Sequence, residues 1–125
     1  MTGWLALLAG GLIGTAGRYL LSGVVQRYAG TGFPYGTLAV NLLGCLIIGF
    51  LASLAEQRTI LTAEARLFWF VGFLGAFTTF STYIYESWQF LRNGQLTLAV
   101  ANLLGSILLG LLALWLGHLA ASAIR

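Results

Sequence analysis

Charge is what this sequence lacks most. Charged residues make up only 7% of its 125 residues, lysine and aspartate are absent altogether, and hydrophobic residues make up 59%. So few charged groups cannot provide the polar surface that a water-soluble domain of this length needs. The composition therefore predicts an integral membrane protein, with membrane lipid and no nucleic acid among its partners.

Cysteine, histidine and acidic residues are also scarce. The single cysteine, Cys45, excludes an intrachain disulfide. Cys45 and the single histidine, His118, fall in different apolar segments, so they form no constellation for a side-chain metal site or a nucleophile. We therefore do not expect an enzyme.

What the sequence has instead is long apolar segments, which span residues 4–28, 36–55, 66–91 and 96–122. About 20 helical residues cross the hydrocarbon layer of a membrane, which is roughly 30 Å thick. The loops between the segments are short and contain turn-forming residues, so none has room for a further domain. We expect a single all-α domain over residues 1–125, with four transmembrane helices in the cell inner (plasma) membrane.

Arginines are nearly balanced across the predicted membrane. Arg58, Arg66 and Arg125 fall on the side of the N-terminus, whereas Arg27 and Arg92 fall on the other side. The positive-inside rule then gives little preference for either orientation. A chain that inserts both ways permits an antiparallel, dual-topology homodimer.

The first segment combines closely spaced glycines with an arginine. Gly10 and Gly14 form a small-xxx-small pair that favours close helix packing, and Arg18 extends the same helical face. An arginine at the centre of a membrane helix costs about 2.5 to 3.5 kcal/mol on insertion scales. Two interpretations remain open: Arg18 snorkels to the lipid headgroups, or it provides positive potential in a water-filled vestibule.

An internal match relates the two halves of the chain. NLLGCLIIGFLA (Asn41–Ala52) closely matches NLLGSILLGLLA (Asn102–Ala113). A duplicated two-helix unit would make Asn41 and Asn102 equivalent positions, although chance similarity between apolar helices is an alternative.

Hydroxyl side chains gather in the third segment, within GAFTTFSTY (Gly75–Tyr83). Hydroxyls compete with helical hydrogen bonds and glycine weakens helices, so the cluster predicts a break at Gly75–Thr78, near the centre of the third helix. Backbone groups freed inside a membrane must be buried in protein or face a cavity, and such breaks commonly form ion sites. If the helix resumes at Phe80, the rings of Phe80 and Tyr83 share a face and offer positive edges to an anion.

Together with GTLAVNLLG (Gly36–Gly44) and GRY (Gly17–Tyr19), this motif resembles the Fluc fluoride channel family, also called CrcB. The resemblance covers all four segments. It implies passive fluoride export, and hence fluoride resistance, through two pores in an antiparallel homodimer. It also implies a structural sodium ion at the dimer centre.

The resemblance implies roles for individual residues. Those implied to line the pore or meet fluoride are Phe80, Tyr83, Asn41, Arg18, Thr37, Thr79, Ser81, Asn102 and Ser106. The backbone carbonyls of Gly75 and Thr78 are implied to bind sodium. Two positions depart from the family pattern, because Tyr83 replaces a second phenylalanine and Gly110 replaces a polar residue.

The alternative is a small multidrug-resistance-type transporter, which is also a four-span, dual-topology dimer. Proton-coupled export of cations needs a carboxylate at membrane depth, usually in the first span. Here the first span carries Arg18 and no acid, and Glu86 lies toward the end of the third span. The sequence therefore favours the fluoride channel.

Overall fold

The computed structural model describes residues 1–57 and 60–124 and is helical, with short connections. Four helical stretches are long and apolar enough to cross a membrane: Thr2–Ala29, Tyr35–Gln57, Ala63–Arg92 and Leu96–Ser122. The predicted four-span, all-helical membrane fold is confirmed. Arg58 and Arg125, which were counted in the charge balance, lie outside the described residues.

The first, second and fourth spans are single helices, α1 (Thr2–Ala29), α2 (Tyr35–Gln57) and α6 (Leu96–Ser122). The third span is divided. Its elements are α3 (Ala63–Arg66), the π-helical η1 (Leu67–Phe73), α4 (Leu74–Phe77) and α5 (Phe80–Arg92). The sequence did not predict the π-helical segment.

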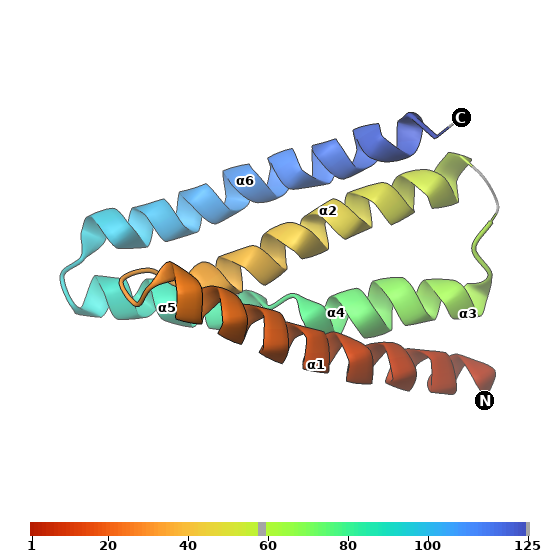
Figure 1. Ribbon diagram of the computed structural model, residues 1–125, viewed down its shortest axis with the longest axis horizontal. Helices are drawn as coiled ribbons and strands as arrows, with labels where there is room; N and C mark the ends of the chain where they lie inside the picture. The colour runs from red at the N-terminus through yellow and green to blue at the C-terminus, as the bar shows by residue number, and fades with distance from the viewer. Residues whose placement is uncertain (58–59, 125) are drawn as a thin grey trace.

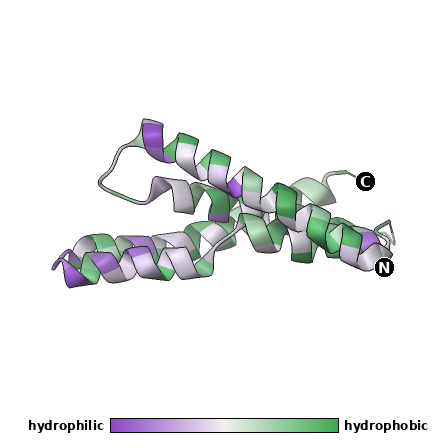
Figure 2. Ribbon diagram, turned by 90° about the horizontal axis from the view of Figure 1, so that it is seen from below, coloured by the Kyte–Doolittle hydropathy of each residue, from purple (hydrophilic) through white to green (hydrophobic). Residues whose placement is uncertain are grey.

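The spans pack as two pairs, and the two members of each pair run in the same direction (Figure 1). In one pair α1 lies beside α3, η1 and α4, and in the other α2 lies beside α6. The N-terminus and the end of α6 lie at the same end of the molecule. Hydrophilic segments gather toward the opposite end, where α1 turns into α2 and α5 turns into α6 (Figure 2).

Glycines let the backbones of α1 and the third span touch. A Cβ atom on Gly10 would lie 2.4 Å from the Phe68 carbonyl oxygen, and one on Gly14 would lie 2.3 Å from that of Phe73. Both glycines are buried. The prediction that this face of the first helix packs inward is confirmed.

The contact between α2 and α6 follows the same principle. A Cβ atom on Gly49 would lie 2.1 Å from the Leu114 carbonyl oxygen, and one on Gly117 would lie 2.1 Å from that of Leu46. Side chains at these positions would push the helices apart, so the glycines set the distance between α2 and α6.

The break in the third span is confirmed, but the predicted position, Gly75–Thr78, is too early. Gly75 is still helical, and the interruption lies at Thr78 and Thr79. The Thr78 N–H still donates to the Leu74 carbonyl (3.0 Å), and the Thr78 hydroxyl donates to the same oxygen (2.8 Å). Thr79 is the first residue whose amide leaves the helix, and its hydroxyl accepts the Thr82 N–H as the N-cap of α5.

We expect Gly117→Ala to lower the free energy of unfolding by about 1–3 kcal/mol, because the added methyl group meets the α2 backbone. Gly23→Ala is the matched control, since a Cβ atom there has nothing within 4 Å. Unfolding midpoints in a detergent titration measure both effects. Equal stability of the two variants would contradict the close packing of α2 and α6.

Candidate functional site

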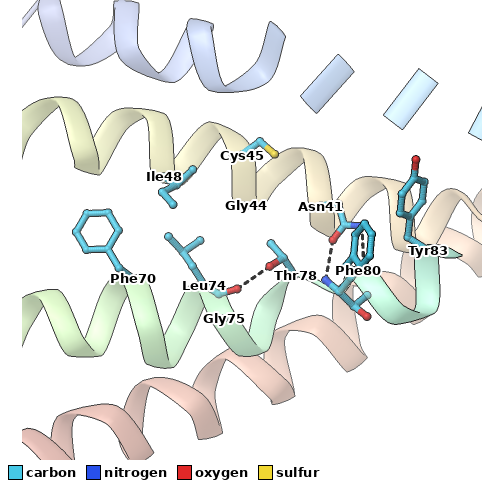
Figure 3. Close-up of a pocket in the computed structure, with 11 residues that line it drawn as sticks. Asn41, Gly44, Cys45, Ile48, Phe70, Leu74, Gly75, Thr78, Phe80 and Tyr83 are labelled. Carbon is cyan, nitrogen blue, oxygen red and sulfur yellow. Dashed lines mark hydrogen bonds between the residues drawn. The ribbon is translucent and has the colours of Figure 1, made fainter. Parts of the chain in front are cut away.

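The break opens onto a cavity of about 370 Å³ between α2 and the third span (Figure 3). The residues that line it lie inside the spans, between Asn41 and Ile48 of Tyr35–Gln57 and between Phe70 and Tyr83 of Ala63–Arg92, so the cavity lies at mid-span. The structure brings part of the predicted site together here. The predicted residues that line the cavity are Asn41, Gly75, Thr78, Thr79, Phe80 and Tyr83.

Asn41 stabilises the break through two hydrogen bonds to the backbone of Thr79. The Thr79 N–H donates to the Asn41 side-chain oxygen (2.8 Å), and the Asn41 amide nitrogen donates to the Thr79 carbonyl (3.1 Å). The Asn41 side-chain oxygen thus replaces the helical acceptor that the Thr79 N–H has lost. An asparagine amide has two N–H groups. Only one is used in the part of the chain that the structure describes, so the other is available at the cavity.

Arg18 also binds the break. Its Nε donates to the Ala76 carbonyl at 3.0 Å. In an unbroken helix that carbonyl would accept the Phe80 N–H, but Phe80 begins α5 after the interruption. The guanidinium therefore satisfies a freed carbonyl at membrane depth, which argues against snorkelling to the headgroups. Its charge thus lies at the break, although Arg18 itself does not line the cavity.

The two aromatic residues are in contact but differ in exposure. The ring centroids of Phe80 and Tyr83 are 5.9 Å apart at an interplanar angle of 57°. Phe80 is 74% exposed in the single chain, whereas Tyr83 is only 7% exposed. The Tyr83 hydroxyl donates to the Leu103 carbonyl of α6 at 2.6 Å. Tyr83 is thus a fixed part of the cavity wall, and Phe80 projects from the surface.

Five predicted site residues do not line this cavity: Arg18, Thr37, Ser81, Asn102 and Ser106. Ser81 is exposed on the first turn of α5. Asn102 is buried, where it donates to the Ser87 hydroxyl at 2.9 Å and accepts from Ser106 at 3.4 Å. Asn102 is therefore bonded across the α5–α6 contact, and Ser106 bonds to Asn102.

Thr37 pairs instead with Glu86, by donating its hydroxyl to one carboxylate oxygen. The other oxygen of Glu86 is buried and has no hydrogen-bond partner among the described residues. Glu86 also lines a separate, polar cavity of about 450 Å³ at the loop end, beside Gln26 and Gln89. Sequence reasoning did not include Glu86 among the site residues. The signal was present, because Glu86 is the acid that falls within a predicted span.

The chain matches the family model described as "CrcB-like protein, Camphor Resistance (CrcB)" over residues 5–118. This chain belongs to the CrcB family. The family resemblance inferred from the sequence is therefore confirmed. Family membership and the four spans make this a multi-pass membrane protein, which in a bacterium lies in the plasma membrane.

Curated relatives cover nearly the whole chain. A protein of Nitrosococcus oceani named fluoride-specific ion channel FluC is 48% identical over 114 residues, which cover 91% of this chain and 90% of the relative. A protein of the same name from Geobacter sulfurreducens is 45% identical over 121 residues, which cover 97% of this chain and 98% of the relative. These relatives are named as channels rather than enzymes.

The Asn41 contact generates a prediction about the Thr79 amide. In Asn41→Leu this N–H loses its acceptor, so its hydrogen-exchange rate should rise by about tenfold, which is the effect of losing a hydrogen bond worth roughly 1.4 kcal/mol. Cys45→Ala is the matched control, because Cys45 lines the same cavity on α2 but makes no hydrogen bond in the described structure. Exchange in detergent, resolved to single residues, measures both. Unchanged protection of Thr79 in Asn41→Leu would show that another group holds the break.

Proposed function

We propose that this protein is a fluoride channel through which fluoride leaves the cell passively. The observation that carries the proposal is the cavity at mid-span, where a broken helix, the Asn41 amide and an aromatic pair meet. Its relatives are named fluoride-specific ion channels, which supports the same function. A second candidate, the multidrug-resistance-type transporter, lacks comparable support, because no acid is among the residues that line the cavity and the charged group at the break is Arg18.

The cavity offers groups suited to a small anion that must shed water. The free N–H of Asn41 donates a hydrogen bond, and the edges of Phe80 and Tyr83 carry partial positive charge. Each contact is weak, so an ion that enters is also able to leave, as conduction requires. The Arg18 charge raises the local anion concentration without binding the ion directly.

The proposed pore is completed by a second, antiparallel copy of the chain. In the single chain, Phe80 and Gly75 are exposed at membrane depth beside an open cavity. A two-fold axis near Gly75 would cover both residues and pair each cavity with elements of the partner. Two equivalent cavities then give two pores per dimer. The balanced arginines support insertion in both orientations.

A structural sodium ion fits the chemistry of the break. In an unbroken helix the Gly75 carbonyl would accept the Thr79 N–H, but that N–H donates to Asn41 instead. The freed carbonyl lies at the C-terminal end of α4, where the helix dipole favours a cation. The carbonyls of Gly75 and Thr78 from both copies would supply hard oxygen ligands for sodium. The ion's role would be to hold the two breaks together at the dimer centre.

Fluoride efflux from liposomes tests the function. We expect the purified protein to release fluoride but not chloride, and Phe80→Ile to lower fluoride flux by roughly tenfold through the loss of the ring edge. Trp115→Leu, which removes an exposed aromatic ring from α6, should keep wild-type flux.

Two results would contradict this proposal. A wild-type protein without fluoride efflux would remove the channel function, and proton-driven export of a cationic dye would favour the multidrug-resistance-type alternative. Wild-type flux in a folded Phe80→Ile variant would instead remove Phe80 from the pathway.

Sodium dependence tests the dimer centre. Dimer stability in detergent should be higher in sodium than in a large organic cation, and Gly75→Val should abolish that difference. A Cβ atom on Gly75 meets nothing within 4 Å in the single chain, so the variant should still fold. Thr78→Ser is the control, since the proposed ligand is a backbone oxygen. Stability that is indifferent to sodium in the wild-type dimer would defeat the sodium site and leave the fluoride channel untouched.

A further inference from the structure

Two polar side chains lie buried between α5 and α6, away from the central cavity. Asn102 is 2% exposed and Ser87 is 3% exposed. The Asn102 amide donates to the Ser87 hydroxyl at 2.9 Å, and that hydroxyl donates to the Tyr83 carbonyl at 2.9 Å. A membrane interior offers no water to such groups, so these bonds are retained only in one relative position of the helices.

A second link joins the same helices one turn away. The Tyr83 hydroxyl donates to the Leu103 carbonyl at 2.6 Å. Tyr83 and Ser87 are four residues apart on one face of α5, and their partners on α6 are adjacent in sequence. Two attachments on one face prevent α5 from rotating about its axis.

The position of the Tyr83 hydroxyl decides what the ring presents to the cavity. Figure 3 shows the hydroxyl pointing away from Asn41 and Thr78, while the ring lies at the cavity wall. A hydroxyl that donates to Leu103 has no second hydrogen to donate to an ion. Tyr83 therefore presents its ring rather than its hydroxyl to the cavity.

We propose that Tyr83, Ser87 and Asn102 form a hydrogen-bonded clamp that locks α5 against α6 and fixes the Tyr83 ring at the wall of the ion pathway. In this account Asn102 is a positioning residue that acts through Ser87, and it does not contact the ion. The consequence for transport rests on the proposed function, whereas the clamp itself does not.

A double-mutant cycle on fluoride flux separates positioning from ion contact. Ser87→Ala and Asn102→Ala each break the same hydrogen bond, which should lower flux by roughly threefold, the effect of a typical hydrogen bond between membrane helices. The double variant should then be no slower than either single variant. Ser122→Ala is the matched control, because among the described residues the Ser122 hydroxyl bonds to a carbonyl of its own helix and to no other helix. If the fold-reduction of flux in the double variant equalled the product of the two single-variant reductions, Asn102 would act independently of Ser87. That result would overturn the clamp.

Ring motion provides a readout that does not depend on transport. In protein with ring-labelled tyrosine, the signal that disappears in Tyr83→Phe identifies Tyr83. NMR should show slow flips of this ring in the wild type and faster flips in Asn102→Ala and Ser87→Ala, with no change in Ser122→Ala. Fast flips in the wild type, or equal rates in all variants, would overturn the clamp. Absence of fluoride efflux with slow wild-type flips would reject the proposed function alone.

Discussion

The hydrogen bonds between Asn41 and the backbone of Thr79 are the interaction on which the site depends. A helix broken inside a membrane exposes N–H and C=O groups that lipid cannot satisfy, and each costs several kcal/mol. Here Asn41 from α2 satisfies Thr79, and Arg18 from α1 satisfies Ala76. The hydroxyl of Thr79 caps the new helix. The break is therefore built by three different spans, and it exists only when all of them are packed together.

Glycine packing brings these groups within reach. Gly10 and Gly14 hold α1 against the third span, so that Arg18, one turn further along the same face, arrives at the break. Gly44, three residues after Asn41, likewise lets α2 approach the third span closely. A Cβ atom on Gly44 would lie 2.2 Å from the methyl group of Thr78. A larger residue at that position would separate Asn41 from Thr79 and leave the break unsupported.

The sequence predicted the fold well because membrane spans depend on local composition. Length and hydropathy identify the spans, and the hydroxyl cluster identifies the interrupted one. The exact position of the break was not predictable, because it depends on which amide Asn41 reaches from another helix. The same limit applies to Asn102, whose partner is Ser87 on α5. Of the residues that the family resemblance placed in one pore, some line the central cavity, whereas Asn102 and Ser106 lie in an interhelical contact and Ser81 is exposed.

The most direct test of this account is an experimental structure of the protein in lipid nanodiscs, at a resolution that shows side-chain amides. The account predicts an extended backbone at Thr78 and Thr79, with the Asn41 amide bonded to both the N–H and the carbonyl of Thr79. A third helix that continues without interruption from Ala63 to Arg92, with Asn41 directed elsewhere, would contradict it.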